Sequence, residues 1–313
     1  MFKLSLSLGL IILALILSQS LKHFNKNLAK EMKVLKNFTF LVLNPIVMVN
    51  SFWTINFSNI TILLLPFICI FILASNGFFG VLIAKKLKYS REEQAAMFAS
   101  STFSNLGTIG GLVTFVFLGQ EAYSMAAMYI ILESVYNYLI AYPLVKTIGD
   151  GEKMKTMDRV KSIVKDPTIM IYQATIVVGL ILNFSPLSRP AVMATYNDIM
   201  IPVISFLLIF SIGYTMDLEK MKSRVNSAYM VLALKYLVSP SIAMIFAFTC
   251  FSDPMIRKVL FIMALVPCGF NSIFVPTIYK ADKNIATASW LFTTAALVIT
   301  IPLEYFIVTY LPF

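Results

Sequence analysis

The length, composition and charge of the chain narrow its class. It has 313 residues, of which 59% are hydrophobic and 13% are charged. Soluble globular proteins are about 45–50% apolar and about 25% charged, so this composition excludes a soluble single domain, a disordered chain and a nucleic-acid-binding protein. The net charge of +10 is instead typical of a membrane protein, whose basic residues collect in cytoplasmic loops.

Ten apolar stretches are long enough to cross a bilayer, which requires roughly 20 mostly apolar residues. They are 4–21, 37–54, 60–84, 94–118, 122–145, 167–185, 197–216, 226–250, 256–279 and 286–312. The segments between them are short, the longest being 146–166, so no water-soluble domain fits between them. We therefore predict an all-α integral membrane protein with ten transmembrane helices, called spans 1 to 10.

The distribution of Lys and Arg predicts how the spans are oriented. Most of the 25 basic residues lie in the loops that join spans 1–2, 3–4, 5–6, 7–8 and 9–10, and such loops are typically cytoplasmic. Span 1 has features of a signal peptide, but its basic residues mostly follow the apolar run instead of preceding it. We expect a multi-pass protein of the cell (plasma) membrane with both termini outside.

The chain divides into two halves with five spans each. Because five is an odd number, the second half must enter the membrane from the opposite side, which is the arrangement of an inverted repeat. We predict a first five-helix repeat at 1–147, a cytoplasmic linker at 148–166 and a second five-helix repeat at 167–313. Pro45 near the start of span 2 corresponds to Pro202 near the start of span 7.

The fourth span of each half carries a cluster of helix-breaking residues. Span 4 contains Ser-Asn-Leu-Gly-Thr-Ile-Gly-Gly at 104–111, and span 9 contains Val-Pro-Cys-Gly-Phe-Asn-Ser at 266–272. Gly and Pro weaken the backbone hydrogen bonds of a helix, and in hydrocarbon a break persists only where other groups satisfy it. Close helix packing against the glycines is the simpler explanation, but two breaks at matched positions favour a binding site.

Such breaks offer a site with a preference for anions. Each one creates a helix N-terminus with partial positive charge and free N–H groups, and Asn adds two donors and one acceptor carbonyl. Two breaks that meet at mid-membrane form a small polar cage. The candidate substrate-binding residues are Asn44, Asn105, Gly107, Thr108, Gly110, Pro267, Gly269, Asn271 and Ser272.

Ionisable residues inside a span are costly to bury and are therefore functional candidates. Glu133 lies near the middle of span 5, and Tyr136 and Asn137 extend a polar stripe along its helix. We expect Glu133 to exchange protons or to hold a cation; the alternative is a neutral carboxyl that pins helices together. Lys235 inside span 8 is expected to pair with a carboxylate such as Glu133 or Asp217, to attract an anion, or to snorkel.

Four residues are therefore coupling candidates, namely Ser104, Glu133, Asn137 and Lys235. Three acidic residues near span ends, Asp198, Asp217 and Glu304, are expected at the wet interface. The cysteines Cys69, Cys250 and Cys268 lie at no metal-ligand spacing, the chain has one histidine, and it has no Gly-rich phosphate loop. We expect no metal site and no cofactor, apart from H⁺ or Na⁺ as a coupling ion.

The residues at the two breaks resemble the auxin efflux carrier family, the bacterial relatives of plant PIN-type carriers. In span 4, Asn105, Gly107 and Gly110 match the family pattern, although Leu106 and Leu112 replace its Thr and Pro. In span 9 and after it, Pro267, Asn271, Tyr279 and Asp282 match, and Lys280 replaces a Gly. The similarity covers essentially the whole chain.

The resemblance implies two inverted five-helix repeats whose broken helices 4 and 9 cross near the midplane. It implies elevator-like movement of a core against a scaffold that includes helices 1, 2, 6 and 7, within a homodimer. It also implies a small organic anion as substrate, such as malonate, malate or an auxin-like acid.

The sequence thus predicts a secondary carrier driven by a proton gradient or the membrane potential, with the lipid bilayer and a small organic anion as its partners. Two alternatives remain open. A bile-acid-type sodium symporter has a similar ten-helix architecture, and a non-transporting membrane sensor would use the same pocket to report a ligand. An enzyme is not expected, because the sequence has no His pair and no activated Ser or Cys arrangement.

Overall fold

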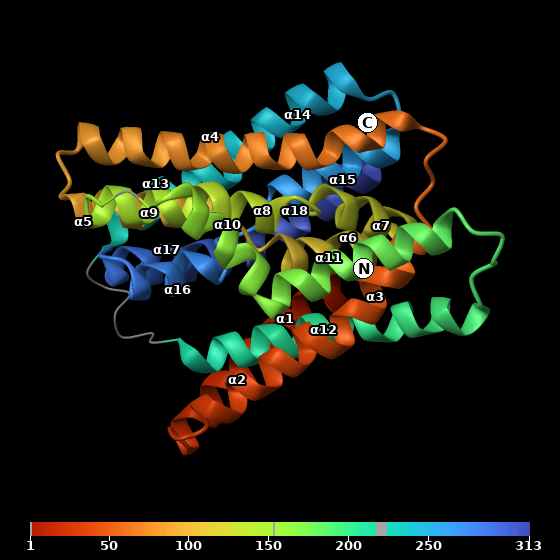
Figure 1. Cartoon of the computed structure of the whole chain (residues 1–313), viewed down its shortest axis with the longest axis horizontal. Coiled ribbons are helices and arrows are strands. Elements are labelled where there is room, and N and C mark those ends of the chain that lie inside the picture. Colours follow the sequence, from red (N-terminus) through yellow and green to blue (C-terminus); the bar gives the residue numbers. More distant parts are fainter. Residues whose placement is uncertain (1, 153, 217–223) are drawn as a thin grey trace.

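The computed structural model describes residues 2–152, 154–216 and 224–313 (Figure 1). The regular structure of this part of the chain is helical, apart from one isolated β-bridge. Its first half contains α1 Phe2–Phe24, α2 Ala29–Phe38, α3 Asn44–Trp53, α4 Leu65–Lys86, α5 Arg91–Thr102, α6 Gly111–Leu118, α7 Gln120–Tyr129, α8 Glu133–Tyr136 and α9 Tyr142–Gly149. Its second half contains α10 Thr156–Lys165, α11 Pro167–Asn183, α12 Ala191–Thr215, α13 Val225–Ala233, α14 Ser239–Cys250, α15 Pro254–Ala264, α16 Asn271–Ile278, α17 Lys283–Ala295 and α18 Leu297–Tyr310.

Six helical segments within the described residues are long and apolar enough to cross a membrane. They are Ser5–Phe24, Ala29–Trp53, Ile60–Lys86, Gln120–Gly149, Ala191–Thr215 and Val225–Cys250. The number rises to eight if each of two bent pairs crosses as one unit, namely α10 with α11, bent by 68°, and α17 with α18, bent by 45°. The chain is therefore an all-helical, multi-pass membrane protein.

The two predicted spans with helix breakers are interrupted in the structure. Predicted span 4 consists of α5, a π-helical turn at Leu106–Gly110 and α6. Predicted span 9 consists of α15 and α16 with an irregular segment between them. Each piece is shorter than the roughly 20 residues that a crossing helix needs, so these two segments stand apart from the six continuous ones.

Two predicted boundaries differ from the structure. The helix of predicted span 2 begins at Ala29, well before residue 37, because Ala, Lys, Glu and Met in its first turns favour helix despite their polarity. The predicted linker 148–166 contains α10, whose Asp158 in the first turn and Lys165 in the last turn complement the helix dipole.

Glycines allow several helix pairs to pack at close range. A Cβ on Gly77 of α4 would lie 2.6 Å from the Phe98 ring of α5, and one on Gly179 of α11 would lie 2.5 Å from Phe52 of α3. Gly213 of α12 faces Ser18 of α1 in the same way. Close approach through small residues is the usual means of helix association in membranes.

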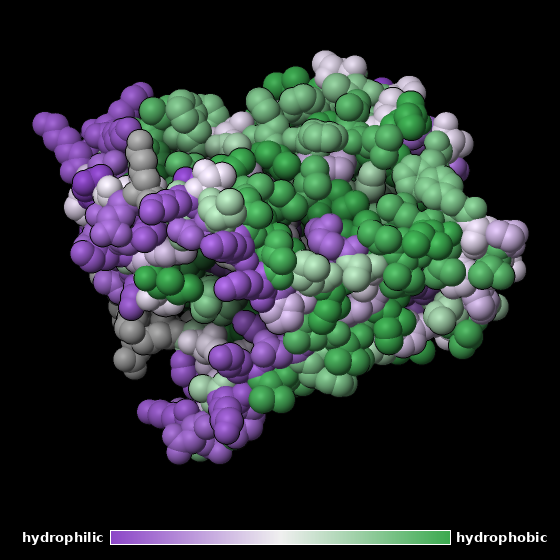
Figure 2. Space-filling view, in the orientation of Figure 1, coloured by the Kyte–Doolittle hydropathy of each residue, from purple (hydrophilic) through white to green (hydrophobic). Residues whose placement is uncertain are grey.

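The surface divides into an apolar body and a polar end. Figure 2 shows hydrophobic residues over the central part of the visible face and hydrophilic residues gathered at its left end. That end holds the turn between α4 and α5, the end of α9 and the connection from α16 to α17 (Figure 1). Three of the basic loops identified in the sequence, those after spans 3, 5 and 9, thus begin at the same end of the described helices (Figure 1).

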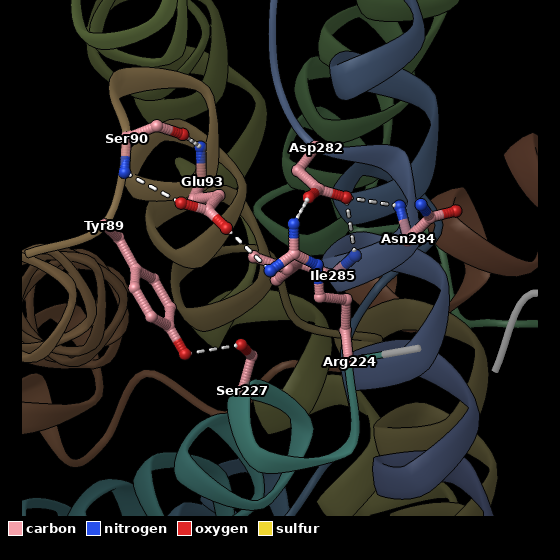
Figure 3. Close-up of polar contacts among 8 residues, drawn as sticks. All are labelled: Tyr89, Ser90, Glu93, Arg224, Ser227, Asp282, Asn284 and Ile285. Atoms are coloured by element: carbon pink, nitrogen blue, oxygen red, sulfur yellow. Dashed lines mark hydrogen bonds and ion pairs between the residues drawn. The ribbon is translucent and has the colours of Figure 1, made fainter. Parts of the chain in front are cut away.

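An arginine joins three elements at this polar end. Arg224, just before α13, contacts Glu93 of α5 at 2.7 Å and Asp282 before α17 at 2.9 Å (Figure 3). Asp282 also caps α17 by accepting from the backbone N–H groups of Asn284 and Ile285. Helices α5 and α17 are therefore tied to the start of α13.

Candidate functional site

The break in span 4 is a short extended segment between two helices. It begins after α5, since Phe103 has φ −74° and ψ 124° and Asn105 has φ −86° and ψ 58°. The break in span 9 lies between Ala264 and Asn271. Gly269 and Pro267 lie inside it, as expected from residues that weaken or remove helical hydrogen bonds.

The two breaks are hydrogen-bonded to each other. The Asn105 N–H donates to the Pro267 carbonyl at 2.9 Å, and the Gly269 N–H donates to the Phe103 carbonyl at 3.0 Å. Together they form an antiparallel bridge between Ser104 and Cys268. Each break thereby satisfies backbone groups of the other, which is the condition for irregular backbone at membrane depth.

Lys235 reaches this bridge from the helix of span 8. It is fully buried, and its Nζ donates to the Phe103 carbonyl at 3.1 Å and to Ser104 Oγ at 2.6 Å. Of the two predicted carboxylate partners, Glu133 is not at ion-pair distance from Lys235 among the described residues, although the two groups interact electrostatically, and Asp217 lies outside the described residues. Snorkelling is wrong, since backbone and hydroxyl oxygens inside the protein hold the ammonium.

A cavity of about 350 Å³ lies against the two breaks. Nine of the thirteen predicted site and coupling residues line it: Asn44, Ser104, Asn105, Gly107, Thr108, Glu133, Asn137, Gly269 and Asn271. They come from α3, from both breaks and from the helix of span 5, which are far apart in the sequence. The structure therefore gathers most of the predicted residues around one space.

Four predicted residues do not line the cavity. A Cβ on Gly110 would lie 3.0 Å from Met263 and Val266, so this glycine serves packing. Ser272 Oγ is buried and donates to the Gly269 carbonyl at 2.6 Å. The Pro267 carbonyl accepts a hydrogen bond in the bridge between the two breaks. Lys235 donates to Ser104 Oγ, and Ser104, not Lys235, lines the cavity.

The polar stripe on span 5 is only partly as predicted. Glu133 and Asn137 lie one turn apart on the helix, and both line the cavity. Tyr136 is buried away from the cavity, and its hydroxyl lies 2.8 Å from Thr102 Oγ1. The stripe thus divides between the cavity and a contact with α5.

Of the acidic residues expected at the wet interface, Asp198 is exposed and accepts from Gln120 at 2.6 Å, whereas Glu304 is only 2% exposed. The bend between α17 and α18 makes Leu297 the start of a new helix. Glu304 therefore lies in the middle of α18, away from either end, and the expectation for it is wrong.

Several lining residues were missed by the sequence analysis. Lys36 and Asn37 lie at the cavity, and the Lys36 ammonium is 4.6 Å from the centre of the Phe270 ring. Tyr138, whose hydroxyl donates to Asp166, also lines it together with that carboxylate. Lys36 falls in the predicted loop between spans 1 and 2, and Asp166 is the last residue of the predicted linker 148–166; only the folded arrangement brings them to the cavity.

Comparisons with known families agree with this geometry. A family model described as membrane transport protein matches residues 8–174, more than half of the chain. The chain belongs to this family, which is the auxin efflux carrier family that the residues at the breaks resemble. A second model, the sodium bile acid symporter family, matches residues 202–311. A search among curated protein sequences found no match.

Family membership defines the class of the protein. It is a secondary membrane transporter, and both matching family models describe transport proteins.

Proposed function

We propose that this protein carries a small organic anion, a carboxylate such as malonate, malate or an auxin-like acid, by alternating access. The observation that carries the proposal is the position of Asn105 and Asn271 on one cavity, each at the start of the second piece of a broken helix. Amide groups and helix N-terminal ends are both donors to carboxylate oxygens.

The size of the cavity suits such a substrate. Its volume of about 350 Å³ is at the lower end of the roughly 300–1,000 Å³ typical of small-molecule sites. Its wall mixes polar groups from the breaks with apolar and aromatic side chains such as Met48, Tyr123 and Tyr172. A dicarboxylate or an aromatic acid fits this combination of polar and apolar contacts.

We propose a ten-helix architecture of two inverted five-helix repeats, with spans 4 and 9 crossing near the midplane. Helix contacts support a division into two groups. In one group, α1, α2 and α3 of spans 1 and 2 pack on α11 and α12 of spans 6 and 7. In the other, α4 packs on α5, α5 packs on α16 and α17, and α13 packs on α17. Movement of the second group against the first is an elevator-like step.

Glu133 is the proposed carrier of a coupled proton. Its carboxyl faces the cavity from the middle of the helix Gln120–Gly149. An ionised Glu133 would repel an anionic substrate, whereas a protonated carboxyl donates a hydrogen bond to it. Proton binding and anion binding are thereby linked, so that a proton gradient, or the membrane potential, drives transport.

Sodium coupling is the second candidate mechanism, and the match of residues 202–311 to the sodium bile acid symporter family favours it. Under this mechanism Glu133 and backbone carbonyls at the breaks bind Na⁺. A membrane sensor that binds the same anion without moving it is a third reading. No enzymatic activity and no cofactor are proposed.

We also propose an orientation, a location and an assembly for the protein. Because hydrophilic residues gather at one end of the visible face (Figure 2) and the loops after spans 3, 5 and 9 begin there (Figure 1), we propose that this end is cytoplasmic, with both termini outside. The plasma membrane is the proposed location, and a homodimer the proposed assembly.

Uptake of labelled malonate, malate and indole-acetate into proteoliposomes tests the proposal, with pH, Na⁺ and voltage gradients imposed separately. We expect saturable uptake of at least one of these acids, increased by an inward proton gradient. Binding without uptake by folded protein would favour the sensor, and the absence of both would contradict an organic-anion site.

A further inference from the structure

Lys235 places a charged group deep inside the helical segment Val225–Cys250. Its side chain is fully buried, and its ammonium donates to the Phe103 carbonyl and to Ser104 Oγ. A charge at membrane depth is costly unless polar groups compensate it. Both hydrogen-bond acceptors belong to the break in span 4, and Glu133, which lines the cavity, interacts with the ammonium electrostatically.

These acceptors are of the kind that bind a metal cation. Phe103 directly follows α5, so its carbonyl lies at the C-terminal end of a helix, which carries partial negative charge. In transporters with broken helices, unwound carbonyls and such helix ends coordinate the coupling Na⁺. The Lys235 ammonium contacts oxygens of the same kind, the Phe103 carbonyl and the Ser104 hydroxyl.

The charge also lies next to the anion cavity. Ser104 lines the cavity, and its hydroxyl accepts the hydrogen bond from Lys235. The following residue, Asn105, lines the same cavity and begins the second piece of the broken helix. Because charges are weakly screened in a protein interior, the ammonium attracts an anion held by Asn105.

We infer that Lys235 is a built-in cation of the transport site. Its ammonium supplies, as part of the chain, the positive charge that a bound Na⁺ supplies in a sodium-coupled carrier, so that the organic anion binds without sodium. This inference rests on the proposed function, because it identifies the positive partner of the proposed anion. It also separates this chain from the sodium-coupled alternative.

The first test measures binding of labelled malonate to the purified full chain, with Na⁺ replaced by choline at constant ionic strength. Wild-type affinity is expected to be the same in both salts. Lys235→Met, which keeps the length and removes the charge, is expected to lower affinity by about tenfold or more. Lys235→Arg, which keeps the charge, is expected to retain more affinity than Lys235→Met.

A matched control is available in α1. Lys3 Nζ also donates to a backbone carbonyl, that of Phe117, at 3.0 Å, but it lies away from the two breaks. Lys3→Met therefore makes the same chemical change and also removes an ammonium–carbonyl hydrogen bond, but at an exposed position. Its malonate affinity is expected to equal that of the wild type.

The second test does not depend on the substrate. Lys235→Ala leaves the Phe103 carbonyl and the Ser104 hydroxyl facing the vacated space. A cation that binds the folded state raises its melting temperature. Sodium chloride, compared with choline chloride, is therefore expected to raise the melting temperature of Lys235→Ala and to leave that of the wild type unchanged.

Wild-type malonate binding that requires Na⁺, or a wild-type melting temperature that Na⁺ raises, overturns the inference. Unchanged malonate affinity in folded Lys235→Met also overturns it. If the wild type binds none of malonate, malate and indole-acetate, the proposed function fails. The comparison of wild-type and Lys235→Ala melting temperatures in the two salts then decides the inference by itself.

Discussion

Gly269 lies directly against the backbone of Ser104. A Cβ on Gly269 would be 2.6 Å from the Ser104 carbonyl oxygen and 2.8 Å from its carbonyl carbon. These atoms belong to the backbone and cannot turn aside as a flexible side chain does. The absence of a side chain at residue 269 is therefore what allows the two breaks to reach hydrogen-bonding distance.

Gly269→Ala is expected to separate the two breaks and to destabilise the protein by about 1–3 kcal/mol, the usual cost of overpacking. Melting temperature in detergent and malonate uptake measure the effect, and both should fall. Gly9→Ala is the control, because a Cβ at Gly9 meets nothing within 4 Å. Equal melting temperatures for the two variants would show that the breaks tolerate a wider separation.

Asn105→Ala and Asn271→Ala are each expected to weaken malonate binding. A hydrogen bond to a charged group contributes about 1.5–3 kcal/mol, which corresponds to a loss of affinity of roughly 10- to 150-fold. Asn27→Ala, at an exposed position in the loop after α1, controls for the loss of an amide. Wild-type affinity in both cavity variants would exclude the breaks as the anion site.

Glu133→Gln is expected to remove the pH dependence of uptake and its response to a proton gradient. The amide keeps the shape and polarity of the side chain, but it does not gain or lose a proton with pH as a carboxyl group does. Glu121 is the control, because it lies at an exposed position in the first turn of α7, just before the same predicted span. Glu121→Gln should retain the wild-type profile. A pH profile that Glu133→Gln does not alter would assign Glu133 a structural role.

Arg224→Gln is expected to lower the stability of the polar end by about 1 kcal/mol at neutral pH, because its partners are partly exposed. Lys146→Gln is the control, since Lys146 pairs at 3.4 Å with Glu152, whose side chain is 74% exposed. Lys146→Gln should lower the melting temperature less than Arg224→Gln does.

The pH dependence of this effect follows from Glu93. Burial raises the pKa of Glu93, but hydrogen bonds from Ser90 and the Arg224 guanidinium outweigh burial and leave the pKa below its ordinary value. A lowered pKa in the folded state stabilises the protein above the ordinary carboxyl pKa of about 4.3. This contribution is lost as the pH falls through the lowered pKa. The difference in melting temperature between the wild type and Arg224→Gln should therefore shrink in acid, and a constant difference would contradict the role of Glu93.

The sequence predicted the positions of the breaks because Gly and Pro have local effects on a helix. Gly269 and Pro267 could be recognised without knowledge of their neighbours, and so could the matched cluster around Asn105. The charge of Glu133 inside an apolar span was an equally local signal. Nine of the residues that line the cavity could therefore be predicted from residue types and their order.

Other features depend on contacts that have no sequence signature. The acceptors of Lys235 are a backbone carbonyl and a hydroxyl. Neither group has a sequence pattern that identifies it as the partner of a distant ammonium. Lys36 was counted with the basic loops because its charge precedes the apolar run of span 2, whereas in the structure α2 continues through it into that span. Glu304 was placed at a span end because the bend between α17 and α18 could not be predicted from an unbroken apolar run.

The pairing of Asn105 with Pro267 also bears on biosynthesis. A chain made from its N-terminus inserts span 4 well before residue 267 has been synthesised. Until then the N–H of Asn105 and the carbonyl of Phe103 lack their partners from span 9, and unpaired backbone groups are costly in hydrocarbon. Span 4 must therefore remain near water, lipid headgroups or an insertion factor until the second half arrives. The first half alone is not expected to form a stable unit in the membrane.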